Sequence, residues 1–191
     1  MMKTEVFHLS KMTKRQLTLL KTALLSGAPC ILPTDTVYGL MTLATANKAR
    51  ENLNKIKNNP QNKPTQILCT LKQAEILADN KDQLEQAQKH WPGALTAILT
   101  ASKEGKRYSS IETVGLRVPD SQFLLEIMKS LISPLLATSA NLHGQTPCKN
   151  TSELLEVFDG LVPCIVLDDG PNKNTPSKII DFTKNPPRVI R

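Results

Sequence analysis

Short apolar runs alternate with amphipathic stretches along this chain, and the alternation limits the fold more than any other feature. The runs 29–33 and 135–138 are apolar and end in proline or in a hydroxyl side chain, which is typical of buried strands. Elsewhere apolar residues recur at helical spacing, as in 17–24 and 46–56. Because no repeat or linker interrupts this pattern, we predict a single α/β domain over 1–191, built around a mixed β-sheet.

Residues typical of helix ends help to locate where the expected helices begin and end. Thr13 and Gln16 are spaced as a capping box, and Gly27 is placed to end the helix that follows. Asn150 and Glu153 have the same spacing ahead of another helix. Further helical segments are expected within 74–87 and 121–128, and further strands at 66–70, 95–100, 114–118, 161–167, 179–180 and 189–190.

The composition excludes several classes of protein. No stretch approaches the roughly 20 uninterrupted apolar residues that a membrane-spanning helix needs, and the first residues lack the apolar run of a signal peptide. We therefore expect a soluble, cytoplasmic protein without a membrane partner. The four cysteines form no CxxC pair and have no histidine at ligand spacing, so we expect reduced, partly buried thiols and no protein-held metal.

The net charge of +7 is concentrated in two segments. Residues 46–72 contain six basic side chains and one acid, which gives +5. Residues 171–191 contain five basic side chains and one acid, which gives +4, so the rest of the chain is net −2. Two explanations stay open: general solubility, or a polyanionic partner such as nucleotide phosphate or RNA.

Hydroxyl and amide side chains follow three of the expected strands, where the loops of an open α/β sheet converge on ligands. The three segments are 34–36, 138–141 and 175–177. Beside Lys57, Lys63 and Arg117 they would form a pocket of neutral donors and cations, suited to a phosphate or a carboxylate. The alternative is that these residues only form turns and cap helices.

Several catalytic motifs are missing from the sequence. It contains no GxxxxGK[ST] or GxGxxG loop, so a P-loop or dinucleotide-binding fold is not expected. It also lacks GxSxG and HExxH, and its three histidines are scattered. An enzyme built this way would work by positioning reactants and stabilising phosphate charge, without a covalent nucleophile.

Seven segments, in order along the chain, resemble the motifs of the YrdC-like threonylcarbamoyl-AMP synthases. Residues 33–40 read PTDTVYGL, which is the family's signature, and 138–144 resemble its TSANxSG motif. Lys57 and Pro60 with 63–64 resemble KxRP, and 91–96 resemble WPGPxT. The remaining matches are 115–119 to G-x-R-x-P, 176–181 to the late PSxI-D element and 189–191 to the closing I-R.

The resemblance implies a fold and an activity. The fold is a twisted mixed β-sheet flanked by helices, with a concave, positively charged cleft. The activity is condensation of L-threonine, bicarbonate and ATP into threonylcarbamoyl-AMP with release of pyrophosphate, and Mg²⁺ is expected to arrive with the nucleotide. The product would pass to tRNA-threonylcarbamoyl transferase proteins for a modified adenosine in tRNA, and a supporting role in attracting tRNA stays open.

The resemblance also implies roles for individual residues. Lys57, Ser139 and Asn141 would be catalytic and would contact the ATP phosphates, with Arg191 nearby. The residues implied to hold threonine are Thr34, Arg117 and Ser177, of which Arg117 would bind the carboxylate.

Asn59 stands where the family has an arginine, two residues after the lysine. An amide has neither the charge nor the fork of a guanidinium, so either Lys63 or another cation replaces it at the ATP or phosphate binding is weaker. This leaves open a YrdC-like paralogue that binds RNA or nucleotide without synthase activity. A tRNA-binding protein that uses the same basic concavity is a further alternative.

Overall fold

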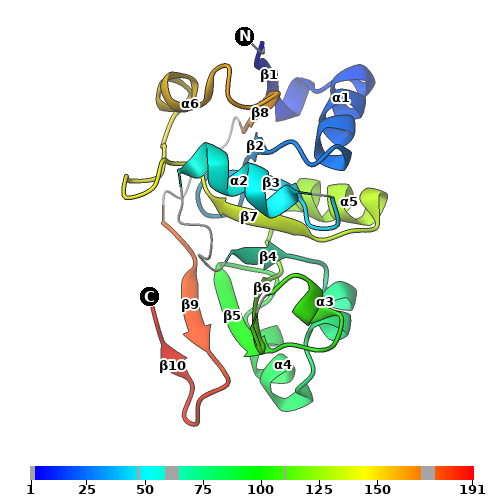
Figure 1. Ribbon diagram of the computed structural model, residues 1–191, viewed down its shortest axis with the longest axis vertical. Helices are drawn as coiled ribbons and strands as arrows, with labels where there is room; N and C mark the ends of the chain where they lie inside the picture. The colour runs from blue at the N-terminus through cyan, green and yellow to red at the C-terminus, as the bar shows by residue number, and fades with distance from the viewer. Residues whose placement is uncertain (1–2, 47, 59–64, 110, 169–174) are drawn as a thin grey trace. The chain divides into compact units, whose positions relative to one another are not determined.

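The computed structural model describes residues 3–46, 48–58, 65–109, 111–168 and 175–191, in which helices and strands alternate along the chain (Figure 1). The chain divides into two compact units. The first unit comprises 1–63 and 136–175, and the second comprises 64–135 and 176–191. A single domain over 1–191 stays a prediction, and each unit is considered by itself below.

The described residues of the first unit contribute five strands, in the order β1, β8, β2, β3 and β7. β8 pairs in parallel with β1 and β2, whereas β2 and β3 are antiparallel, so the pairing is mixed as predicted. The strands expected at 29–33 and 135–138 are confirmed, and the one expected at 161–167 begins later. The strands are β1 (Glu5–His8), β2 (Cys30–Leu32), β3 (Gly39–Leu43), β7 (Leu135–Ser139) and β8 (Cys164–Leu167).

Helices of the first unit flank these strands. α1 packs against β2 and β3, and α2 packs against β3. The predicted capping box at Thr13 is confirmed, because Thr13 Oγ1 accepts from Gln16 N and Gln16 Oε1 accepts from Thr13 N. The described helices are η1 (Leu9–Lys11), α1 (Lys14–Leu25), α2 (Ala49–Lys57) and α6 (Thr151–Phe158).

Two helix starts differ from the expectation. The helix expected over 46–56 begins at Ala49, because Lys48 before it has a left-handed backbone with φ of 58°. At α6 the side chain of Asn150 accepts from Glu153 N, as predicted. Glu153 bonds instead to Lys149 N and to Asn150 Nδ2, so the reciprocal half of the capping box is wrong.

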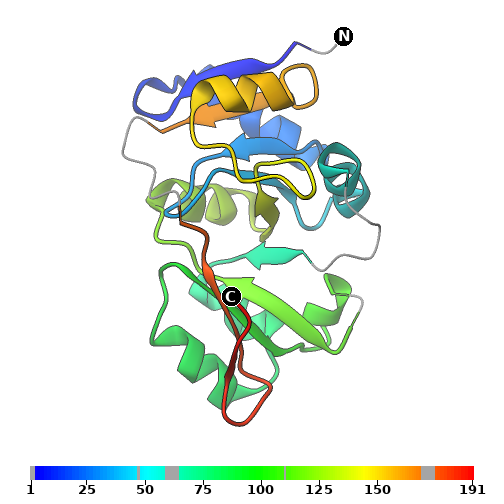
Figure 2. The same cartoon turned by 90° about the vertical axis from the view of Figure 1, so that its left-hand side faces the viewer.

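The second unit also has mixed pairing, in the order β4, β6, β5, β9 and β10 among its described residues. β5 is antiparallel to β6 and parallel to β9, and Figure 2 shows β9 and β10 as the red hairpin at the end of the chain. α4 packs against β5, and α3 packs against α4. The elements are β4 (Gln66–Leu68), α3 (Leu71–Leu77), α4 (Lys81–Gln88), β5 (Leu95–Thr100), η2 (Gly105–Arg107), β6 (Thr113–Arg117), α5 (Gln122–Leu131), β9 (Lys178–Asp181) and β10 (Arg188–Val189).

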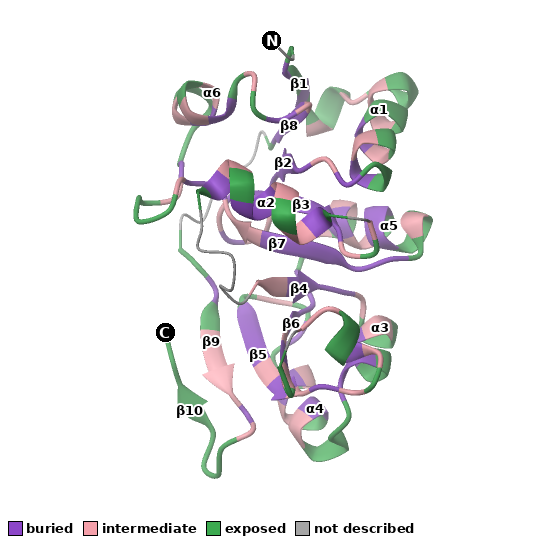
Figure 3. Cartoon of the chain, in the orientation of Figure 1, coloured by how far each residue is buried: buried purple, intermediate pink, exposed green. Residues whose placement is uncertain are grey.

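The strands carry much of each unit's core. Figure 3 shows β2 and β3 as buried, and most of β5 and β7 with them, whereas β10 is exposed. Leu20 and Leu24 of α1 are fully buried in the first unit, as are Leu99 and Leu116 in the second. A mixed sheet flanked by helices is therefore confirmed. No helix among the described residues is both long and apolar enough to cross a membrane.

All four cysteines are free thiols, and all four are buried rather than partly buried. Burial raises the pKa of Cys69 from 9.0 to about 12. Cys30 and Cys164 lie on neighbouring parallel strands, next to the paired residues Ile31 and Ile165. The hydrogen bond between the two thiols raises the pKa of Cys30 and lowers that of Cys164.

The raised pKa of Cys69 predicts a loss of stability in alkali. Above about pH 9 the unfolded thiol ionises while the folded thiol stays protonated, so the free energy of unfolding falls as pH rises toward 12. Urea unfolding at about pH 8 and pH 10.5 measures the effect, for which we expect about 2 kcal/mol more loss in the wild type than in Cys69→Ala. Equal losses in the two proteins would contradict this assignment.

Candidate functional site

A buried lysine ends helix α2 and is held by three acceptors. The ammonium of Lys57 donates to the backbone oxygen of Ser139 at 2.6 Å, to Ser139 Oγ at 3.2 Å and to Asn141 Oδ1 at 2.8 Å. Lys57 is only 4% exposed. The three predicted phosphate-binding residues Lys57, Ser139 and Asn141 are therefore neighbours, although Lys57 lies more than 80 positions before the other two along the chain.

The loop after β7 fixes this geometry. Asn141 Nδ2 donates to the backbone oxygens of Leu142 and Gln145, at 2.7 and 2.8 Å, which sets the direction of its amide. Asn141 Oδ1 therefore faces Ser139 Oγ, which donates to it at 2.6 Å. The backbone N–H of His143 donates to the carbonyl of Lys57 at 2.9 Å, which ties the loop to the end of α2.

These contacts suit an anion-binding group. The three acceptors named above are neutral groups, and they orient the ammonium of Lys57. The C-terminal end of α2 also favours a cation at this position. A buried cation held by dipoles attracts a phosphate or carboxylate oxygen more strongly than a lysine in water does. We name this group, Lys57 with Ser139 and Asn141, the lysine cluster.

Thr34 lies in the same unit, in the turn between β2 and β3. Its Oγ1 donates to the carbonyl of Val37 at 2.7 Å and accepts from Thr36 N at 2.9 Å. These bonds close the turn, so residues 34–36 have a structural role. Whether that is their whole role is not decided by these contacts. Binding of threonine by Thr34 stays a prediction.

In the second unit, Arg117 ends β6 and is 2% exposed. Its Nε donates to the carbonyl of Gly93 at 3.1 Å, and Gly93 N donates to the carbonyl of Val118 at 2.9 Å. A Cβ at Gly93 would lie 2.8 Å from the carbonyl oxygen of His90, so only glycine fits. The carbonyl of Gly93, in the segment 91–93, thus helps to hold the guanidinium in place. Binding of a carboxylate by Arg117 stays a prediction.

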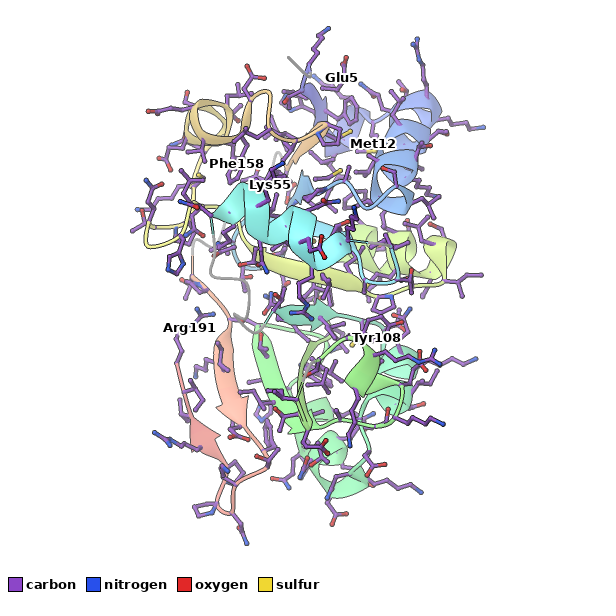
Figure 4. All side chains as sticks on the ribbon, in the orientation of Figure 1. Glu5, Met12, Lys55, Tyr108, Phe158 and Arg191 are labelled. Atoms are coloured by element: carbon purple, nitrogen blue, oxygen red, sulfur yellow. The ribbon has the colours of Figure 1, made fainter. Side chains whose placement is uncertain are left out.

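Ser177 stands directly before β9, in a network that the sequence did not predict. Its Oγ lies 2.9 Å from Thr96 Oγ1, which donates to Gln66 Oε1 at 2.8 Å. Arg191, labelled in Figure 4 near the end of the chain, donates from Nε and Nη2 to the backbone oxygen of Ser177. Arg191 therefore contacts Ser177, which is predicted to hold threonine. Binding of ATP by Arg191 stays a prediction.

The predicted site residues thus fall into two sets. Thr34 and the lysine cluster belong to the first unit, and Arg117, Ser177 and Arg191 belong to the second. Asn59 and Lys63 lie outside the described residues. Within the described residues, no group of three or more histidine, cysteine, aspartate or glutamate side chains could hold a metal ion.

Comparison with protein families and curated proteins places the chain among known relatives. The sequence model of the Sua5/YciO/YrdC family, described as "Telomere recombination", matches residues 22–191. A threonylcarbamoyl-AMP synthase of Pyrococcus abyssi is 32% identical over 171 residues, which are 86% of this chain and 50% of that protein. One of Vibrio campbellii is 28% identical over 169 residues, 83% of this chain and 90% of that protein. The chain therefore spans half of the first relative and most of the second.

Solved structures share the fold. The crystal structure of P. abyssi Sua5 complexed with L-threonine has a TM-score of 0.87 and 27% identity, covering 98% of this chain and 57% of that one. Escherichia coli YciO has a TM-score of 0.85 and 23% identity, covering 100% of this chain and 95% of that one, and its likeness concerns the fold alone. These matches confirm the predicted twisted mixed sheet flanked by helices; the charge of the cleft stays a prediction.

Proposed function

The chain belongs to the Sua5/YciO/YrdC family, and from this premise we propose that it is a threonylcarbamoyl-AMP synthase. It would condense L-threonine, bicarbonate and ATP into threonylcarbamoyl-AMP and pyrophosphate. Two relatives of that name, aligned over more than four fifths of the chain, support the proposal. The geometric observation that carries it is the lysine cluster, in which a buried lysine is oriented by Ser139 and Asn141.

The phosphates of ATP are assigned to the lysine cluster. Lys57 would offset the charge that grows on the departing pyrophosphate, and Ser139 and Asn141 would orient it. Asn59, Lys63 and Arg191 are assigned to ATP as well. Mg²⁺ would arrive bound to the nucleotide and supply further charge compensation on its phosphates.

Threonine is assigned to Arg117, Thr34 and Ser177. The carboxylate suits the guanidinium of Arg117, whose buried position strengthens a two-pronged hydrogen bond. P. abyssi Sua5, a relative of the same family, has been crystallised with L-threonine.

The reaction needs two bond-forming steps and no covalent enzyme intermediate. The threonine amine attacks the carbon of bicarbonate, and loss of a proton and hydroxide leaves a carbamate. A carbamate oxygen then attacks the α-phosphorus of ATP, and the bond to the β,γ-phosphates breaks. In this scheme the protein holds the reactants in line and stabilises the leaving pyrophosphate.

Pyrophosphate release tests the proposed function. We expect release only when ATP, bicarbonate and threonine are all present, with omission of any one reducing it to background. Release that does not depend on threonine would contradict a synthase. No release, together with retained binding of ATP or tRNA, would favour the paralogue that binds nucleotide or RNA without this activity.

The same proposal assigns the chain a place in tRNA modification. Threonylcarbamoyl-AMP is an activated mixed anhydride, so a transferase that moves the threonylcarbamoyl group to tRNA would have to consume it. Direct attraction of tRNA by the basic segments, and a cytoplasmic location, are parts of this proposal.

Gly93→Ala tests the support of Arg117. The added Cβ would meet the carbonyl of His90 and displace the backbone oxygen that accepts from Arg117 Nε. We expect the KM for threonine to rise about tenfold, as for loss of one charged hydrogen bond, while the KM for ATP changes little. Steady-state kinetics measure both constants.

Gly115→Ala is the matched control. A Cβ at Gly115 meets only Thr96 Cγ2, at 3.9 Å, so this variant should keep both KM values. An equal rise for threonine and ATP in Gly93→Ala would argue for general distortion and against a specific effect on Arg117.

A further inference from the structure

Ser177 is the end of a chain of hydrogen bonds whose direction can be worked out. The amide oxygen of Gln66 can only accept, so the single hydroxyl proton of Thr96 is used in the 2.8 Å bond to it. Thr96 Oγ1 then has only lone pairs left for Ser177, 2.9 Å away. The proton between the two hydroxyls must therefore come from Ser177.

Backbone contacts and burial around Ser177 maintain this direction of hydrogen bonding. Lys178 N donates to the carbonyl of Ala94 at 2.9 Å, and the guanidinium of Arg191 bonds to the Ser177 carbonyl from Nε and Nη2. Thr96 and Ser177 are only 3% and 4% exposed, so little water competes for their hydroxyls. Among the described residues, Thr96 is the one partner of Ser177 Oγ.

We propose that Gln66 and Thr96 are specificity-determining positioning residues, which make Ser177 Oγ an acceptor-only group for a hydrogen-bond donor of the amino-acid substrate. The proposal rests on the proposed function. A carboxylate or phosphate oxygen has no proton to donate and would face the lone pairs of Ser177 unfavourably. Ser177 therefore binds the amine or the hydroxyl of threonine, and the carboxylate is left to a cation.

Ligands that replace one donor by an acceptor test this directly. O-methyl-L-threonine lacks the hydroxyl proton, and 3-hydroxy-2-methoxybutanoate lacks the amine protons. Calorimetry on the full chain measures their dissociation constants relative to L-threonine. In the wild type, we expect the analogue altered at the group that faces Ser177 to bind at least about tenfold more weakly.

Two variants release the Ser177 proton by different routes. Thr96→Val removes the acceptor, and Gln66→Leu lets Thr96 donate to Ser177 instead. In both variants, Ser177 can donate to the ether oxygen of the analogue that is altered at the group facing Ser177. The ratio of its dissociation constant to that of L-threonine should therefore fall to within about threefold. Thr96→Ser restores the hydroxyl and should restore the ratio. Thr100→Val makes the same change on the same strand and should leave the wild-type ratio intact.

If the ratio falls for O-methyl-L-threonine, the hydroxyl of threonine is the group that donates to Ser177. If it falls for 3-hydroxy-2-methoxybutanoate, the amine is that group. Unchanged ratios in Thr96→Val and Gln66→Leu, or an equal loss of affinity for all three ligands, would overturn the proposal and leave a merely structural role. In that case threonine-dependent pyrophosphate release by the wild type would still stand. Failure of the wild type to bind threonine at all would overturn both the positioning role of Gln66 and Thr96 and the proposed function.

Discussion

We expect Lys57→Ala to lower kcat/KM for ATP by about 100- to 1,000-fold, which is the usual cost of losing one preorganised charge-stabilising donor. The ammonium is buried and held on three neutral acceptors, so its charge acts in a setting of low dielectric. The loss should appear mainly in kcat, because negative charge on the leaving pyrophosphate is greatest in the transition state. Steady-state pyrophosphate release separates kcat from KM.

Lys55→Ala is the control for this variant. Lys55, labelled in Figure 4, lies on the same helix and is exposed. The variant therefore removes the same charge from α2 and leaves the lysine cluster intact. We expect it to keep activity within about threefold, since exposed charges are screened by solvent and salt. Similar losses in both variants would mean that the general basicity of α2 matters and that the cluster does not.

Arg117→Lys should raise the KM for threonine by about 100-fold while the KM for ATP stays within about threefold. Lysine keeps the charge but cannot form the planar, two-pronged grip on a carboxylate, nor can it reproduce the bond from Nε to the carbonyl of Gly93. The magnitude corresponds to losing one strong charge-assisted hydrogen bond in a buried site.

The matched control is Arg107→Lys, which makes the same exchange at an exposed arginine paired with Glu104 at 3.1 Å. It should leave both KM values unchanged. A thermal melt of each variant checks that the fold persists. Parallel rises in the two KM values of Arg117→Lys, or no rise at all, would contradict the assignment of Arg117 to the carboxylate.

The fold could be predicted where local rules dominate. The strand over Leu95–Thr100 follows from a short, mostly apolar run, and the capping box at Thr13 follows from short-range hydrogen bonding. β1 was not predicted, because Glu5–His8 has one buried residue among exposed ones and exists as a strand only by pairing with β8, which lies more than 150 residues later. Such pairing leaves no local signal in the sequence.

The candidate site was predictable to a similar extent. The motifs identified Lys57, Ser139 and Asn141, and the structure brings those three together. Neither Gln66 nor Thr96 was predicted, because polar residues within otherwise apolar strands have no local feature that shows what they contact. Their partners come from β4, β5 and the residue before β9, and only the folded arrangement makes them neighbours.

The origin of the carbon in the product tests the central proposal most directly. The protein would be incubated with ATP, L-threonine and ¹³C-labelled bicarbonate, and the nucleotide products analysed by mass spectrometry. A synthase yields threonylcarbamoyl-AMP that carries the heavy carbon in its carbamoyl group, and Lys57→Ala forms this species about 100- to 1,000-fold more slowly. Formation of only AMP or ADP, or a threonylated nucleotide without the label, would contradict the proposed function.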